Sequence, residues 1–292
     1  MKRTLFVGSA TAMVTPFYND QVDYKAFANM IDHQLSNGTS ALVVCGTTGE
    51  PATLSNEEKE KLIAFAVEQV DGAVPVIAGT GGNNTADVMQ KAKRYARLGV
   101  DAQLCVTPYY NKTTQAGLIA HYTAIADEGS LPVILYNVPG RTGLNMLPNT
   151  VATLAEHPNI IGHKEACADL AQATEMFRLL QGSLPVYSGM DELTVPMLSL
   201  GSLGVISVAS NLIPQKMAAM VMYYLNGEHK KSLDLQLHIL PFVNSIFKQT
   251  SPTPIKAAME MLQLCKEDVR LPLIPLTAQE KEVLKKAVES VL

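Results

Sequence analysis

Eight short segments rich in β-forming residues recur along this chain of 292 residues, and each is followed by a segment with helical periodicity. Parallel strands need such crossover connections, so the alternation favours an α/β fold, a (β/α)8 TIM barrel of eight parallel strands. Such a barrel takes about 250 residues, which leaves room for a modest appendage. The predicted strands are Ser9–Val14, Ala41–Cys45, Val74–Ala78, Ala102–Val106, Pro132–Tyr136, Ile160–Lys164, Leu184–Ser188 and Gly204–Ser207.

The segments between the strands carry helix signals. Ser55 and Glu58 have the spacing of a capping box, which predicts that a helix begins there. Residues 84–98 and 114–128 have the apolar spacing of amphipathic helices. Glycines stand where three of these helices are expected to end, namely Gly99, Gly129 and Gly182.

The alternation stops after residues 226–228, and the remaining residues have the pattern of three helices. A second capping box, from Thr277 to Glu280, opens the last of them. We therefore expect residues 1–227 to form the catalytic barrel and residues 228–292 to form a helical C-terminal extension. No flexible linker precedes the extension, so it should pack against the barrel.

Composition argues against several classes of function. The 23 basic residues form no run, which disfavours a nucleic-acid partner. No stretch has the pattern of a leader or a membrane span, so we expect a cytoplasmic protein without a membrane partner. The 47% hydrophobic content indicates a globular enzyme with subunit contacts. The four cysteines are isolated and predict neither a disulfide nor a metal site: Cys45, Cys105, Cys167 and Cys265.

An open doubly wound sheet is the competing fold, because the segment from Ala78 to Asn84 resembles a dinucleotide-binding loop. The segment lacks the third glycine of that loop, and no acidic residue ends the next strand. We therefore expect no cofactor, and we interpret these glycines as a tight turn at the mouth of the barrel.

Lys164 is a lone cation that closes the apolar run after Pro158. A lysine at the end of a buried strand is desolvated, and a desolvated amine is a nucleophile that forms Schiff bases with carbonyl substrates. The alternative is a lysine whose ammonium group reaches from the strand end into solvent. The other strand ends decide between these two interpretations, because they gather at the same mouth of a barrel.

The predicted strand ends carry hydroxyls, tyrosines and an arginine but no cluster of metal ligands. Together they supply a nucleophile, proton carriers and an anion clamp, which indicates covalent amine chemistry without a metal. The segments are Gly46–Glu50, Thr107–Asn111, Tyr136–Gly143, Lys164–Glu165 and Ser188–Asp191.

Three of these segments resemble the pyruvate-dependent class I aldolases: Gly-Thr-Thr-Gly-Glu at 46–50, Tyr-Asn-Val-Pro-Gly-Arg-Thr-Gly at 136–143, and Lys164-Glu165. Within that superfamily, which includes N-acetylneuraminate lyase, the chain is most similar to the dihydrodipicolinate synthase family over nearly its whole length. The resemblance implies that Lys164 condenses with pyruvate, and that the enamine attacks the aldehyde of L-aspartate 4-semialdehyde. It also implies a homotetramer built as a dimer of dimers.

The resemblance implies roles for the other residues. Thr48, Tyr136 and Tyr110 match a proton-relay triad, with Tyr110 contributed to a neighbouring subunit. Thr47 and Thr48 match the positions that bind pyruvate, and Arg141 matches the position that binds the semialdehyde carboxylate. Gly189 and Ile206 match positions whose backbone lines the pocket.

Glu50 and Glu165 adjoin catalytic positions, but we expect structural roles for both. Side chains alternate along a strand, so Glu165 and His163 should point away from the face that Lys164 occupies. Glu50 follows a tight turn, where its carboxylate can accept backbone amides.

Two alternatives remain for the function. A retro-aldol lyase acting on sialic acid or a 2-keto-3-deoxy sugar acid would share the barrel, Lys164 and Tyr136, but such members usually carry Ser-Thr at 47–48 and lack Arg141. A catalytically inactive barrel serving as a sensor is disfavoured because every matched catalytic position is intact.

The chain departs from its relatives at one place. Members inhibited by L-lysine have a histidine at the position of Lys59 and a glutamate at that of Asp87, beside matches to Ala52, Gly81, Asn83 and Tyr109. An ammonium group at Lys59 would repel the side-chain amine of a bound lysine. We therefore expect weak inhibition by L-lysine or none.

Overall fold

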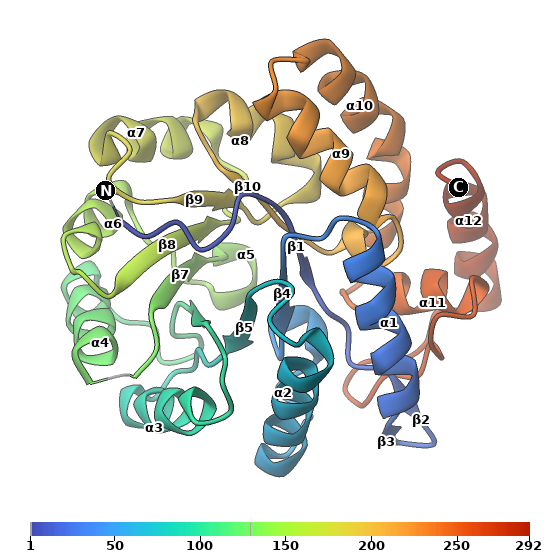
Figure 1. Cartoon of the computed structure of the whole chain (residues 1–292), viewed down its shortest axis with the longest axis horizontal. Helices are drawn as coiled ribbons and strands as arrows, with labels where there is room; N and C mark the ends of the chain where they lie inside the picture. Colours follow the sequence, from blue (N-terminus) through green and yellow to red (C-terminus); the bar gives the residue numbers. More distant parts are fainter. Residues whose placement is uncertain (1, 129) are drawn as a thin grey trace.

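Eight parallel strands close into a barrel in the computed structural model, which describes residues 2–128 and 130–292. Each strand pairs with the next along the chain, and the last pairs with the first. The prediction of a (β/α)8 barrel is confirmed, and Figure 1 shows the strands at the centre of a ring of helices. The strands are β1 Gly8–Ala12, β4 Ala41–Val44, β5 Val76–Gly79, β6 Ala102–Val106, β7 Val133–Asn137, β8 Ile160–Glu165, β9 Val186–Ser188 and β10 Gly204–Ser207.

The barrel strands are short and almost entirely buried, as expected when helices cover a parallel sheet. All four residues of β4, Ala-Leu-Val-Val, are buried. Side chains from the strands also fill the barrel interior, where one cluster includes Ala10, Ile77, Ile134, Tyr136 and Ile206. The barrel is therefore packed inside, and a site can open only at its ends.

The helices around the barrel follow the predicted pattern. The capping box of Ser55 and Glu58 is present and opens α2. Gly99 and Gly182 follow helices and have positive φ, whereas Gly129 lies outside the described residues. The elements are α1 Tyr24–Ser36, α2 Asn56–Val70, α3 Thr85–Ala96, α4 Gln115–Glu128, α5 Pro139–Thr142, α6 Pro148–Ala155, α7 Leu170–Leu180, α8 Thr194–Leu200 and α9 Pro214–Leu225.

A small hairpin, β2 Phe17–Tyr18 with β3 Gln21–Val22, lies between β1 and α1. The hairpin was not predicted, because strands of two residues have no detectable periodicity.

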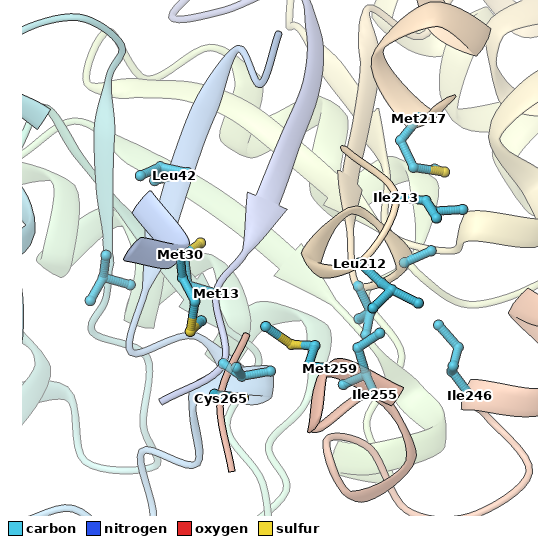
Figure 2. Close-up of a cluster of buried hydrophobic side chains, with 14 of the residues drawn as sticks. Met13, Met30, Leu42, Leu212, Ile213, Met217, Ile246, Ile255, Met259 and Cys265 are labelled. Carbon is cyan, nitrogen blue, oxygen red and sulfur yellow. The ribbon is translucent and has the colours of Figure 1, made fainter. Parts of the chain in front are cut away.

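Three helices follow the barrel as predicted: α10 His229–Ile246, α11 Thr253–Met261 and α12 Ala278–Glu289. They lie together on one side of the barrel (Figure 1). Ile246 and Ile255 belong to the same buried cluster as Leu42 of β4 and Met217 of α9. Figure 2 shows part of this cluster, where apolar side chains of the extension meet those of the barrel. The extension is thus packed against the barrel, as the missing linker predicted.

Among residues 2–128 and 130–292, no helix combines the length and the apolar character needed to cross a membrane.

Candidate active site

Lys164 lies near the end of β8, and the sheet register places it opposite Tyr136 of β7. Paired residues on adjacent parallel strands point to the same face, so both side chains face the barrel interior. Nζ of Lys164 is 4.3 Å from the centre of the Tyr136 ring. The two residues are 5% and 6% exposed. The amine and the phenol are therefore held together where little water remains.

A second tyrosine flanks Lys164 on its other side, because Tyr187 of β9 is also paired with it. The Tyr187 hydroxyl donates to the carbonyl oxygen of Phe6 at 2.9 Å, and the two rings stack. Burial raises the pKa of Tyr187. Tyr187 was not among the predicted site residues. Its hydroxyl is already engaged with the backbone, whereas Tyr136 lines the cavity described below.

Gly189 lies against Lys164 because its lack of a side chain leaves room there. A Cβ atom at position 189 would lie 3.0 Å from Cε of Lys164 and 2.7 Å from Cβ of Ala166. The Gly189 amide donates to the carbonyl oxygen of Glu165 at 2.6 Å. Ile206 is fully buried in the interior cluster that also contains Tyr136. Gly189 thus lies against Lys164, and Ile206 belongs to the same interior cluster as Tyr136.

The two threonines occupy a short 3-10 turn, η1 Thr47–Gly49, directly after β4. Cys45 and Glu50 flank this turn with φ of 55° and 52°, a left-handed conformation that non-glycine residues adopt only when their surroundings enforce it. The turn is also fixed by Thr15, whose hydroxyl donates to the carbonyl oxygen of Gly49 at 2.8 Å. Thr48 is buried, and Thr47 is partly open.

Burial raises the pKa of Cys45 to about 12, so its thiol stays protonated at neutral pH. This cysteine therefore does not compete with Lys164 as the nucleophile.

A cavity of about 580 Å³ opens beside these residues, and Thr47, Tyr136 and Arg141 line it together. Arg141 lies on α5, directly after β7, and is exposed. Its Nη2 donates to the carbonyl oxygen of Ser251 at 3.4 Å. Residues 250–252 and 272–273 form part of the wall, so the C-terminal extension contributes to the site. The sequence contained no signal for that contribution.

Tyr110 is not brought to this cavity within one chain. It is 91% exposed and has a φ of 71°. Its neighbours are held to the loop before α3, because Asn83 donates to the Tyr109 carbonyl oxygen and Asn111 donates to the Asn83 carbonyl oxygen. Tyr109, and not Tyr110, lines the cavity.

The hydrogen bonds of Glu165 agree with the structural role expected for it. The carboxylate accepts from the side chain of Asn137 and the amide of Cys167, each at 3.0 Å. Nε2 of His163 lies 3.1 Å from the other carboxylate oxygen. His163 and Glu165 thus occupy the face of β8 opposite Lys164, as strand alternation predicted.

Glu50 was only partly anticipated. One carboxylate oxygen accepts the amide of Arg270 at 3.2 Å, which fits the expected bonding to backbone amides. The other accepts Nζ of Lys256 at 2.8 Å, and this buried ion pair was missed. The available signal was that Lys256 is a lone cation in the apolar segment from Pro254 to Met259.

Within the described parts of the chain, no three His, Cys, Asp or Glu side chains are grouped so that they could hold a metal ion. The chemistry that this geometry supports is that of an amine, hydroxyl groups and an arginine.

Comparisons with known proteins point to one family. The model of the dihydrodipicolinate synthetase family matches residues 5–291. The chain is 47% identical over 280 residues to 4-hydroxy-tetrahydrodipicolinate synthase of Geobacter metallireducens, covering 96% of this chain and 97% of that protein.

Solved structures are similar over nearly the whole chain as well. Dihydrodipicolinate synthase from Thermotoga maritima has a TM-score of 0.97 and 40% identity, covering 98% of this chain and 99% of the other. The chloride-inhibited enzyme from Acinetobacter baumannii, complexed with pyruvate, has a TM-score of 0.96 and 39% identity, covering 99% of each chain.

Proposed function

The chain belongs to the dihydrodipicolinate synthetase family, and we propose on that premise that it condenses pyruvate with L-aspartate 4-semialdehyde through a Schiff base on Lys164. The product is 4-hydroxy-tetrahydrodipicolinate, and the enzyme is a lyase of lysine and diaminopimelate biosynthesis. The observation that carries the catalytic assignment is the pairing of Lys164 with Tyr136 at the barrel mouth, beside a cavity that Thr47 and Arg141 also line.

The reaction begins when the Lys164 amine adds to the keto carbon of pyruvate and water leaves, which forms an iminium. Loss of a proton from the methyl group gives an enamine, whose carbon attacks the aldehyde carbon of the semialdehyde. The substrate amine then adds to the iminium carbon, closes the ring and releases Lys164. Each step moves a proton to or from an oxygen, nitrogen or carbon atom, so proton carriers must lie within reach.

Tyr136 is the central proton carrier, with Thr48 and Tyr110 completing the relay. Thr47 and the adjacent backbone amides hold the pyruvate carboxylate. Arg141 suits the carboxylate of the semialdehyde, because its planar guanidinium can form two parallel hydrogen bonds. The backbone beside Gly189 and Ile206 lines the pocket. Residues 1–227 act as the catalytic barrel, with 228–292 as its extension.

Borohydride trapping tests the mechanism. Incubation with pyruvate and borohydride should add the mass of one reduced pyruvyl group to each chain, because the reagent converts the iminium to a stable amine. Coupled assays should show condensation with L-aspartate 4-semialdehyde and no cleavage of N-acetylneuraminate. An unchanged mass would contradict the Schiff base, and cleavage of N-acetylneuraminate without condensation would favour the sugar-acid lyase.

The exposed Tyr110 supports assembly, because in an oligomer its ring can pack against a neighbouring subunit and place its hydroxyl in the site of that subunit. We expect at least a dimer and, by analogy with the family, a tetramer. Tyr110→Phe and Lys164→Ala subunits should each be nearly inactive but regain activity when mixed. Statistical mixing into dimers completes roughly a quarter of the sites. Sedimentation that shows a fully active monomer, or mixtures without recovery, would contradict the shared site.

The structure adds a reason to expect weak inhibition by L-lysine. Lys59 is partly buried on the cavity wall, and burial followed by the charge of Lys91 lowers its pKa. Asp87 is already paired with Nζ of Lys91 at 2.5 Å. A second ammonium group beside Lys59 would therefore cost about a kcal/mol or more, and Asp87 would have to leave Lys91 to offset it.

The coupled assay should accordingly show no half-inhibition by submillimolar L-lysine at neutral pH. Because the pKa of Lys59 is lowered, its charge is lost at a lower pH than usual, so any inhibition should strengthen as the pH rises. The double variant Lys59→His/Asp87→Glu, which restores the residues of inhibited relatives, should bind lysine more tightly. Strong inhibition of the unmodified enzyme would show that charge repulsion does not control this site.

A further inference from the structure

Lys256 is a fully buried cation outside the catalytic constellation. It lies on α11, surrounded in sequence by apolar residues, and its side chain is 0% exposed. Nζ donates to Oε1 of Glu50 at 2.8 Å, and the Glu50 side chain is only 2% exposed. Lys256 Nζ also lies 4.3 Å from the centre of the Phe17 ring. These contacts fix the ammonium group in one place.

The partner carboxylate ends the turn that carries Thr47 and Thr48. Glu50 is the C-cap of η1, and its amide donates to the carbonyl oxygen of Thr47 at 3.3 Å. Any movement of Glu50 is therefore transmitted through the backbone to both threonines.

Glu50 is anchored to the extension at a second point. Its Oε2 accepts the amide of Arg270 at 3.2 Å. Arg270 in turn pairs with Glu58 at 2.6 Å and with Asp20 at 2.8 Å, and its guanidinium carbon is 4.5 Å from the centre of the Phe17 ring. The turn after β4 is thus tied to two separate segments of the C-terminal extension.

Stability alone does not explain this pair. Desolvating two charges costs about as much free energy as their attraction returns, and a well-packed apolar pair is often as stable. What an ion pair adds is direction, because the carboxylate must lie where the ammonium group and the amide both reach it. A left-handed residue such as Glu50 needs that kind of restraint.

We propose that Lys256 is a positioning residue whose ion pair with Glu50 fixes the Thr47–Thr48 turn and thereby sets the affinity for pyruvate. This inference rests on the proposed function. It assigns the C-terminal extension a part in substrate binding, because the catalytic turn is held from a helix 206 residues further along the chain. Arg141 is held differently, through the carbonyl oxygen of Ser251.

The double variant Glu50→Gln/Lys256→Met tests the proposal. It removes both charges, so no unpaired charge is buried and the protein folds. The glutamine side chain keeps an oxygen for the Arg270 amide, but the tie to α11 is lost. We expect KM for pyruvate to rise about tenfold or more, which corresponds to the loss of one charge-assisted hydrogen bond. KM for the semialdehyde should change less.

Leu284→Ala is the matched control, because Leu284 is a buried side chain of α12 in the same extension, whereas Lys256 of α11 is the residue that bonds to Glu50. It should lower the melting temperature and leave KM for pyruvate unchanged. A wild-type KM in the double variant, or an equal rise in Leu284→Ala, would overturn the positioning role.

Borohydride trapping at graded pyruvate concentrations provides a readout that does not need the second substrate. The double variant should be trapped as completely as wild type, but only at higher pyruvate concentration. Failure of wild-type trapping would contradict the proposed function itself. Normal wild-type trapping with an unshifted concentration dependence in the double variant would contradict only the role of Lys256.

Discussion

Replacing Lys164 with alanine should abolish trapping of pyruvate by borohydride and lower kcat/KM by at least about 10³-fold. The amine forms the covalent bond to the substrate, and its Nζ lies 4.3 Å from the centre of the Tyr136 ring. Intact-protein mass spectrometry after reduction and the coupled assay measure the two effects. The fold should be retained, because Lys164, although buried, lies near the end of β8 at the mouth of the barrel.

Two other lysines provide controls for this result. Lys59 and Lys91 line the cavity and are the alternative sites of attachment. Lys59→Ala and Lys91→Ala should both be trapped as efficiently as wild type. If trapping survived in Lys164→Ala and disappeared in one of the controls, the lysine replaced in that control would be the nucleophile.

Tyr136→Phe should lower kcat by about 10²- to 10⁴-fold, the usual contribution of a positioned proton carrier. The phenyl ring keeps its contact with Nζ of Lys164, so pyruvate should still be trapped, although more slowly. A kinetic assay combined with the time course of trapping separates the loss of proton transfer from a loss of binding.

Tyr187→Phe is the matched control, since Tyr187 pairs with the same lysine from the other side. Its hydroxyl bonds to the Phe6 carbonyl oxygen, so its removal should cost about 1 kcal/mol of stability and leave turnover nearly unchanged. If both variants lost activity equally, the proton relay would have to include Tyr187, and the assignment of Tyr136 as the central carrier would be wrong.

Local patterns in the sequence determined the barrel, its helices and the candidate nucleophile. A strand that is buried on both faces is a short apolar run, and an amphipathic helix repeats its apolar residues every three or four positions, so both can be recognised within about fifteen residues. Lys164 was recognised from an equally local pattern. Burying a cation at the end of an apolar run costs free energy, so a lysine at such a position indicates a function. The motifs that contain Thr47, Tyr136 and Arg141 can be recognised in the same way, because the residues of each motif are adjacent in the sequence.

The tertiary structure decided the contacts between distant segments. Ring closure set the register that places Tyr136 and Tyr187 on either side of Lys164, and only the surroundings of each hydroxyl distinguish the two tyrosines. Packing of the extension brought Ser251 to Arg141 and Lys256 to Glu50. The sequence does not encode such pairs at any fixed spacing, because they form only when the helices after residue 228 bury their apolar faces against the closed barrel.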